Sequence, residues 1–266
     1  MKISSIVQAL ETLAPTALQE DYDNSGLQLG NIDNECSGVL ISLDATETVV
    51  REAVEKKCNL VVSHHPLIFR GVKRIDPGVE PGRTIFAAIQ HGIAIYAIHT
   101  NLDNVLPGVN STMADRLGLV NRRFLSPRLP AERPGERPAG SGLLGELPQP
   151  LAETAFLDLL RERFNLVLIR HSALTGRPVQ RVALCGGAGS FLIPNALLER
   201  ADFFVSGDIS YHRFFEAGER MVIADIGHYE SEQFSVDLLH DLLVEKFPTF
   251  AVLKAGKPTN PVHYYK

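Results

Sequence analysis

Short apolar runs alternate with stretches in which apolar residues recur at helical spacing. In the first part of the chain, the predicted strands are 38–46, 59–66 and 93–101, and the predicted helices are 47–57, 83–92 and 108–118. Continuous apolar runs separated by amphipathic helices indicate parallel strands that are covered on both faces. This part of the chain is therefore predicted to form a three-layer α/β lobe.

A second alternation follows after a change in composition. Residues 122–142 are rich in Pro, Arg and Gly and show no periodicity, which is typical of a connection. Beyond them, the predicted helices are 152–164, 191–200 and 230–247, and the predicted strands are 165–169, 179–187, 201–207, 221–227 and 249–255. We therefore expect an α/β protein of two linked three-layer α/β/α lobes with mostly parallel or mixed sheets.

The predicted boundaries follow from this pattern. The N-terminal lobe is assigned to 1–125, the connection to 126–142 and the C-terminal lobe to 143–266. The last helix and strand are the exception, since they could pack back on the first lobe.

Composition narrows the class of protein. A chain of 266 residues with 45% hydrophobic content can bury a large core. Its three cysteines, Cys36, Cys58 and Cys185, are far apart, which argues against a disulfide framework or a thiolate zinc site and fits a reducing compartment. Residues 1–15 are amphipathic and do not resemble a signal peptide, and no run is long enough to span a membrane. We expect a cytoplasmic protein.

Charge argues against a nucleic-acid partner. The net charge is −5, from 26 basic and 31 acidic residues, so any electrostatic attraction for nucleic acid would have to be local. The basic stretch 120–128 is interpreted as solvated surface.

Candidate chemistry is concentrated where predicted strands end. Ligands of open α/β sheets bind outside the carboxyl ends of the strands. Three such ends carry histidine and carboxylate: His64 with His65, His99 with Asp103, and His228 with Glu232. Imidazole nitrogen and carboxylate oxygen are ligands for divalent metals. We therefore expect a metal site in the crevice between the lobes.

Two ions are the simpler interpretation of this set. His64 and His65 would point in different directions from an extended backbone, which suits one ion each. His228 and Glu232 are four residues apart at a predicted helix start and so share a face, while Asp103 could bridge two ions. The alternative is that the histidine pair consists of ordinary loop residues.

Other residues have weaker or different interpretations. His99 could ligate a metal or support the Asp103 loop. Residues 185–190, CGGAGS, follow a strand and precede a helix as a phosphate-binding loop would, but a tight turn explains them as well. Glu230 is assigned to the first turn of its helix. Surface or core positions are assigned to His91, His171, His240 and His263.

Six motifs in this order resemble the Nif-three-like proteins (NGG-one-interacting factor three), also described as GTP cyclohydrolase I type-two homologues. They are YDNSGLQLG from Tyr22, SHHPLIFRGVKRI from Ser63, AIHTNLDNVLPGVNSTMADRLGL from Ala97, CGGAGS from Cys185, SGDISYH from Ser206 and ADIGHYESEQ from Ala224. The resemblance covers nearly the whole chain.

The resemblance implies a dinuclear metal site and an assembly. The metal ligands it implies are His64, His65, Asp103, His228 and Glu232. It also implies a toroidal homohexamer, a trimer of dimers. The metal could be zinc, iron, manganese or nickel.

Two functions follow from the proposed site. The first is a hydrolase acting on a nucleotide such as GTP, with His99 in a catalytic role. Polar residues around the site favour an organic substrate: Asp23, Asn24, Arg70, His99, Asp208 and His212. The second is a metal-binding regulator or metal-homeostasis protein without turnover. A DNA-binding role fits the acidic balance least well.

Overall fold

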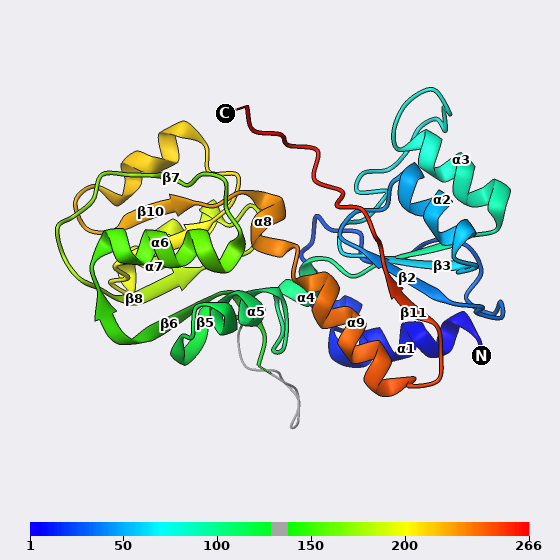
Figure 1. Ribbon diagram of the computed structural model, residues 1–266, viewed down its shortest axis with the longest axis horizontal. Coiled ribbons are helices and arrows are strands. Elements are labelled where there is room, and N and C mark those ends of the chain that lie inside the picture. The colour runs from blue at the N-terminus through cyan, green and yellow to red at the C-terminus, as the bar shows by residue number, and fades with distance from the viewer. Residues whose placement is uncertain (129–137, 266) are drawn as a thin grey trace. The chain divides into compact units, whose positions relative to one another are not determined.

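The protein folds into two compact units. The computed structural model describes residues 1–128 and 138–265. The first unit contains Met1–Leu102 and Ser235–His263, and the second contains Asp103–Phe234 and the chain from Tyr264 onwards. Each unit is built on its own β-sheet, with strand orders β1-β4-β3-β2-β11 and β5-β6-β8-β9-β10-β7 (Figure 1). The prediction of an α/β protein with two sheets is confirmed.

The first sheet is mostly parallel. Its strands are β1 (Gly26–Leu29), β2 (Val39–Ser42), β3 (Leu60–Ser63), β4 (Ala94–Ala97) and β11 (Val252–Lys254). Strands β2, β3 and β4 are buried at every position, as expected for strands covered on both faces. The register pairs Ser42 with Ser63 and Ser63 with Ala97. These three strands therefore end at the same edge, and the residues after them emerge there together.

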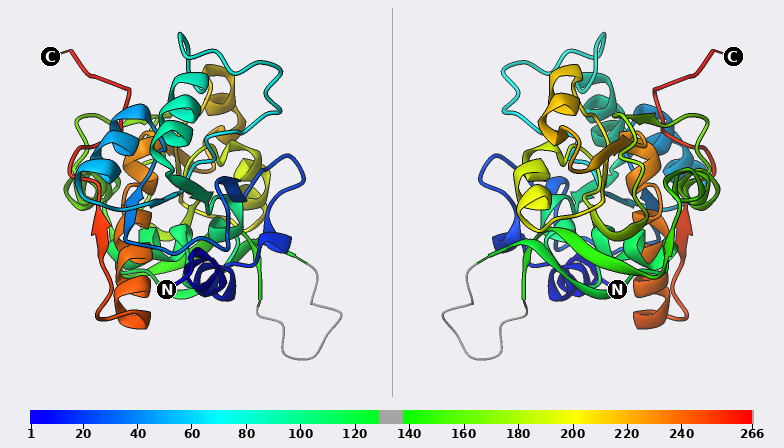
Figure 2. Two further views of the ribbon diagram at one scale, coloured as in Figure 1. Left: turned by 90° about the vertical axis from the view of Figure 1, so that its right-hand side faces the viewer. Right: turned by 90° about the vertical axis from the view of Figure 1, so that its left-hand side faces the viewer.

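Helices cover both faces of this sheet. They are α1 (Ile3–Leu13), α2 (Glu47–Glu55), α3 (Gly82–His91) and α9 (Ser235–Lys246), with a short 3-10 turn η1 (Thr16–Leu18) after the first. Helices α2 and α3 pack together on one face, and α1 and α9 on the other (Figures 1 and 2). Thr46 caps the N-terminus of α2, because its Oγ1 accepts a hydrogen bond from the Val49 N–H (3.3 Å). The apolar stripes of these helices close a three-layer core.

The second sheet is mixed. Its strands are β5 (Val120–Pro127), β6 (Gly140–Leu151), β7 (Arg170–His171), β8 (Val179–Leu184), β9 (Phe203–Ser206) and β10 (Val222–Asp225). Strands β8, β9 and β10 are parallel, while β5, β6 and β7 pair antiparallel with their neighbours. The helical elements of this unit are α5 (Val109–Arg116), α6 (Glu153–Phe164), α7 (Ile193–Leu198), α8 (His228–Glu232), η2 (Ser190–Leu192) and η3 (Tyr211–Ala217). The short helix α4 (Thr100–Asp103) lies at the chain boundary of the two units.

The unit boundaries differ from the predicted ones. The first unit ends at Leu102 and not near residue 125. The two described ends of the predicted connection 126–142 belong to β5 and β6, which pair as neighbours in one sheet (Figure 2). Residues 129–137 lie outside the described residues. A Pro- and Gly-rich composition does not reveal whether the segments on its two sides pair in one sheet, because that depends on contacts between residues distant along the chain.

Two predicted elements were wrong in detail. Residues 165–169 form no strand: α6 ends at Phe164, Asn165 after it is left-handed (φ 55°), and pairing with β10 begins at Arg170 and His171. The helix predicted over 230–247 is two helices, α8 and α9, separated at Gln233–Phe234. The chain changes unit there, so α8 stays in the second unit and α9 packs in the first. The basic stretch 120–128, interpreted as solvated surface, contains β5, in which only Phe124 and Leu125 are buried.

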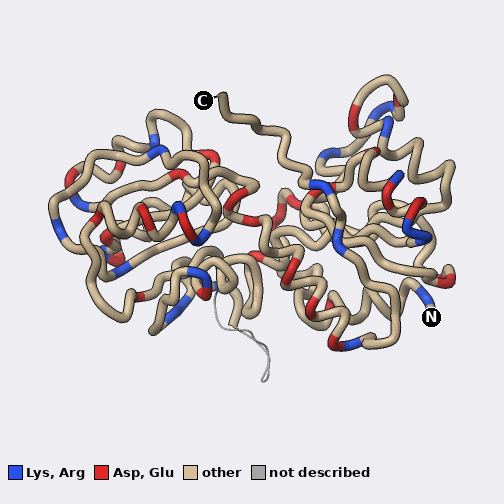
Figure 3. Tube along the Cα trace, viewed as in Figure 1, with Lys and Arg blue, Asp and Glu red and all other residues tan. Residues whose placement is uncertain are grey.

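Charged residues of both signs are interspersed along the chain in the two units (Figure 3). Within 1–128 and 138–265, no helix combines the length and apolar character needed to cross a bilayer.

Phe156 provides a test of the second core. Its side chain is fully buried and meets the Phe203 ring edge-on at 4.8 Å between centroids. Phe156→Ala should lower the free energy of unfolding by about 3–5 kcal/mol, because a large cavity replaces the ring. Leu198→Ala is the control, since Leu198 is 83% exposed, and should change stability by less than about 0.5 kcal/mol. Urea denaturation followed by circular dichroism measures both, and equal effects would contradict this description of the core.

Candidate metal centre

The adjacent histidines follow β3 directly. His64 is fully buried, and its Nδ1 lies 2.9 Å from the Ile98 carbonyl oxygen. His65 is half-buried, and its Nδ1 lies 2.7 Å from Asp44 Oδ1. Both partners are oxygen acceptors, so Nδ1 must carry the proton in each ring, and Nε2 is the nitrogen with a lone pair.

The two rings do not point in opposite directions. Their centroids are 5.0 Å apart. The expectation assumed an extended backbone, but β3 ends at Ser63 and the chain bends at His64 and His65. The alternation of side chains along a strand therefore no longer applies at these positions.

His99 completes a group of imidazoles in the first unit. It follows β4, and its ring centroid lies 5.3 Å from that of His64 and 5.4 Å from that of His65. One ring nitrogen from each of the three histidines lies within 4.8 Å of the others. Nδ1 of His99 is 2.7 Å from Asp23 Oδ1, so Nε2 is again the nitrogen with the lone pair.

The Asp23 carboxylate is held from several sides. Its side chain is fully buried and accepts hydrogen bonds from the Asn24 N–H (2.7 Å), the Ser25 hydroxyl (3.0 Å), and the backbone and hydroxyl of Thr100. Burial raises the pKa of Asp23, but the hydrogen bond and charge of His99 and the bond from Thr100 outweigh it and hold the pKa well below its usual value. Asp23 is therefore an ionised anchor for His99.

Asp44 orients the ring of His65 as Asp23 orients the ring of His99, and it was not among the site residues predicted from the sequence. Its carboxylate also accepts a hydrogen bond from the Thr259 hydroxyl. Burial raises the pKa of Asp44, but hydrogen bonds from His65 and Thr259 and the charge of His65 lower it overall. The strand predicted over 38–46 includes Asp44, whereas β2 ends at Ser42, so this carboxylate lies at a strand end that the hydrophobic pattern did not mark.

In the second unit, His228 and Glu232 lie on one face of α8. His228 Nε2 is 3.1 Å from Glu232 Oε2, and His228 Nδ1 is 2.8 Å from Asp208 Oδ2. Glu232 is 2% exposed, and one of its carboxylate oxygens lies within 4.8 Å of one from Asp103, the last residue of α4. Two carboxylates this close repel each other, which a cation would relieve.

Two glycines make room for α8. Gly187 has φ 59°, and a Cβ there would lie 2.2 Å from Glu232 Oε1. Gly227 has φ 92°, and a Cβ there would lie 2.2 Å from Glu230 Oε2. Any other residue would strain the backbone and displace these carboxylates.

The CGGAGS loop uses its backbone donors within the protein. The N–H of Gly186 donates to Asn110 Oδ1 (3.0 Å), that of Gly187 to Ser231 Oγ (2.9 Å) and that of Gly189 to Ser206 Oγ (2.9 Å). A phosphate would have to displace these bonds. The structure therefore favours the tight turn over the phosphate-binding loop.

Other predicted polar residues have different neighbours. Asn24 donates from Nδ2 to the Ile68 carbonyl (2.6 Å), in the loop after His65. The ring of His212 contacts Tyr211 in η3. Arg70 lines a pocket beside His65.

Comparison with known proteins agrees with this architecture. A family model described as Duf34/NIF3 (NGG1p interacting factor 3) matches residues 1–261. A Campylobacter jejuni protein named GTP cyclohydrolase 1 type 2 homolog is 32% identical over 267 residues, covering 100% of both chains. A Clostridium perfringens protein of the same name is 31% identical over 233 residues, covering 87% of each.

Solved structures have the same fold. A Staphylococcus aureus protein superimposes with a TM-score of 0.89 at 29% identity, covering 100% of this chain and 99% of the other. A Bacillus cereus protein related to NIF3 gives a TM-score of 0.90 at 23% identity, which supports the fold alone. The match of the family model over almost the whole sequence, together with these relatives, means that this chain belongs to the DUF34/NIF3 family.

Proposed function

We propose that this chain is a metal-dependent hydrolase in which His64, His65, Asp103, His228 and Glu232 hold two divalent ions. The donors fit such ions, because His64, His65 and His228 each use Nδ1 in a hydrogen bond within the protein, and Nε2 of His228 lies beside the Glu232 carboxylate, a second donor of the set. Zinc, manganese, iron and nickel all accept this mixture of nitrogen and oxygen. Divalent ions supply Lewis-acid activation of water and of an electrophilic centre.

The Asp23–His99 pair carries the case for catalysis. His99 is outside the five proposed ligands, yet a buried, ionised carboxylate fixes its tautomer through a 2.7 Å contact. An imidazole held in this way can accept a proton from water at Nε2 and later return it. A protein that only stores metal has no need of this arrangement. We therefore assign His99 as the acid–base residue and Asp23 as the residue that positions it.

A nucleotide or related compound is the proposed substrate. The relatives are named GTP cyclohydrolase 1 type 2 homologs. Opening the guanine imidazole ring requires attack of water on a ring carbon and then loss of formate, which is hydrolytic chemistry. The alternative, a metal-binding regulator or homeostasis protein, uses the same ligands without turnover.

Assembly and location complete the proposal. On the basis of family membership, we propose a toroidal homohexamer, a trimer of dimers. A cytoplasmic location suits the three buried cysteines Cys36, Cys58 and Cys185.

Metal content tests the ligand set. Protein reconstituted with zinc or manganese should hold about two ions per chain, and His64→Ala should reduce this to about one or less. His91→Ala is the matched control, because His91 is exposed at the end of α3. Elemental analysis after gel filtration gives the stoichiometry. A wild-type value that stays at one or below, or metal loss that His64→Ala does not affect, would refute the dinuclear site.

Paired measurements separate an enzyme from a metal binder. His99→Ala should retain most of the metal and lower hydrolysis by roughly 10²–10⁴, the usual contribution of a positioned acid or base. Asp23→Asn should change activity in the same direction, because an amide no longer fixes the Nδ1–H tautomer. Asp103→Asn should damage turnover through the metal site itself, since a neutral amide bridges ions poorly.

The assay uses GTP and a panel of other nucleotides, with metal content measured on the same samples. If wild type shows no turnover above Asp103→Asn on any of them, the regulator or homeostasis role replaces the hydrolase.

Light scattering tests the assembly. At micromolar concentration the protein should have about six times the chain mass, because symmetric closed rings are stable end states of association. A stable monomer that binds metal normally would contradict the hexamer.

A further inference from the structure

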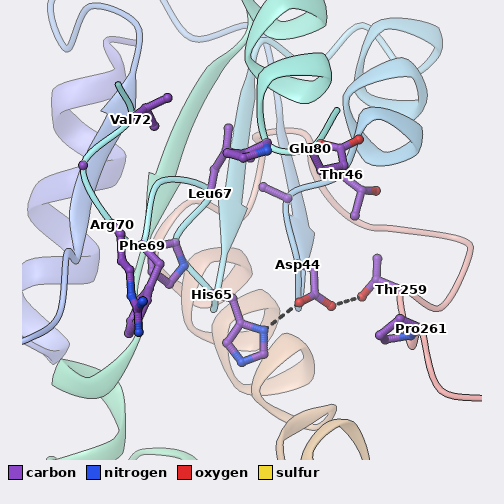
Figure 4. Close-up of a pocket in the computed structure, with 14 residues that line it drawn as sticks. Asp44, Thr46, His65, Leu67, Phe69, Arg70, Val72, Glu80, Thr259 and Pro261 are labelled. Carbon is purple, nitrogen blue, oxygen red and sulfur yellow. Dashed lines mark hydrogen bonds and ion pairs between the residues drawn. The ribbon is translucent and has the colours of Figure 1, made fainter. Parts of the chain in front are cut away.

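A pocket of about 650 Å³ opens beside His65 in the first unit (Figure 4). It is lined by residues that follow β2 and β3, by the start of α3 and by the C-terminal segment at Thr259 and Pro261. Its volume lies within the range of sites for small organic molecules. The pocket is therefore large enough for more than a metal ion and its waters.

The walls are mostly apolar. They include side chains that offer no hydrogen bonds, those of Pro66, Leu67, Phe69, Val72 and Pro261. In Figure 4, Phe69 lies on one side of His65, and Pro261 lies on the other. Walls of this kind favour a ligand with an apolar or aromatic body.

The acidic groups of the pocket already have partners. Asp44 accepts hydrogen bonds from His65 and Thr259, and Glu80 Oε2 accepts one from the Thr84 hydroxyl (2.8 Å). Carboxylates satisfied in this way do not require a cationic ligand.

Arg70 differs from these acids. Its side chain lines the same pocket and is exposed, and within the described part of the chain it makes no hydrogen bond or ion pair. A guanidinium presents several N–H donors in a planar fork that matches a carboxylate or a phosphate group. The charge that the pocket presents to a ligand is therefore the positive charge of Arg70.

The same pocket reaches a proposed metal ligand. His65 forms part of its lining, and the hydrogen bond from Nδ1 to Asp44 directs its Nε2 away from that carboxylate. A molecule seated against Phe69 and Arg70 would lie next to the proposed centre. This position suits a substrate.

We propose that the pocket binds an organic anion, with one carboxylate or phosphate group on Arg70 and an apolar or aromatic body against Leu67, Phe69 and Pro261. The identification of this ligand as a substrate rests on the proposed hydrolase function. Its binding in the pocket does not depend on that function. Arg70 is the one cationic side chain among the described lining residues, so the pocket itself suits a single anionic group better than the several charges of a triphosphate chain.

Calorimetric titration with phenyl phosphate tests the pocket. The full-length protein is used in metal-free and metal-loaded forms, and metal content is measured on each sample. Arg70→Gln should weaken binding by about tenfold or more in both forms, since a charge-assisted hydrogen bond is lost. Arg74→Gln is the matched control, because Arg74 lies in the same exposed loop outside the pocket lining and should leave the affinity unchanged.

One neutral probe and one cationic probe complete the test. Benzyl alcohol should bind more weakly than phenyl phosphate and should not respond to Arg70→Gln, and benzylamine should bind least. The proposal would be overturned if phenyl phosphate bound only in the presence of metal and with an affinity that Arg70→Gln did not change. It would also be overturned if benzylamine bound more tightly than phenyl phosphate, or if phenyl phosphate did not bind. If the protein takes up no metal on reconstitution and still binds phenyl phosphate in a way that depends on Arg70, the pocket is sustained and the proposed hydrolase fails.

Discussion

The hydrogen bond at Nδ1 of each strand-end imidazole is the constraint on which the candidate centre depends. The acceptor is a backbone carbonyl for His64 and a carboxylate for His65, His99 and His228. An oxygen acceptor fixes the proton on Nδ1, so Nε2 is the nitrogen with the lone pair in His64, His65 and His99, while Nε2 of His228 lies 3.1 Å from Glu232 Oε2. Without these partners the same histidines would exchange between tautomers and rotamers. The orientation of the donors is therefore prepared by protein groups that need not touch a ligand.

The anchors are themselves held by the fold. Asp23 comes from the loop before β1, and Asp44 follows β2, whereas the histidines they orient follow β4 and β3. The parallel register of β2, β3 and β4 brings their ends to one edge of the sheet, and the antiparallel pairing of β1 with β4 places the start of β1 at the same edge. In the second unit, α8 begins where β10 ends, and Gly187 leaves the space that Glu232 occupies. The position of each group of donors is thus set by where the strands end and by how closely the backbone segments approach each other.

The pocket beside His65 extends this arrangement from metal to organic ligand. Thr259, at the C-terminal end of the first unit, donates to Asp44, and Asp44 in turn orients His65. One residue of the C-terminal segment is therefore linked to a proposed metal ligand through a single carboxylate. Arg70 lies on the same pocket with its charge uncompensated by the described residues. The first unit therefore contains three imidazoles that could hold a metal, the proposed acid–base pair and the proposed anion-binding arginine.

The sequence by itself determined the local features. Continuous apolar runs predicted the buried parallel strands, because a strand covered on both faces cannot alternate polar with apolar residues. Histidine and carboxylate at the strand ends predicted where metal chemistry would be found, and His64, His65 and His99 do lie together in the first unit. The pairing of β5 with β6, the change of unit at Phe234 and the partnership of Asp44 with His65 were decided only by the tertiary structure. Each depends on contacts between residues distant along the chain, and a local pattern of hydrophobicity does not encode such contacts.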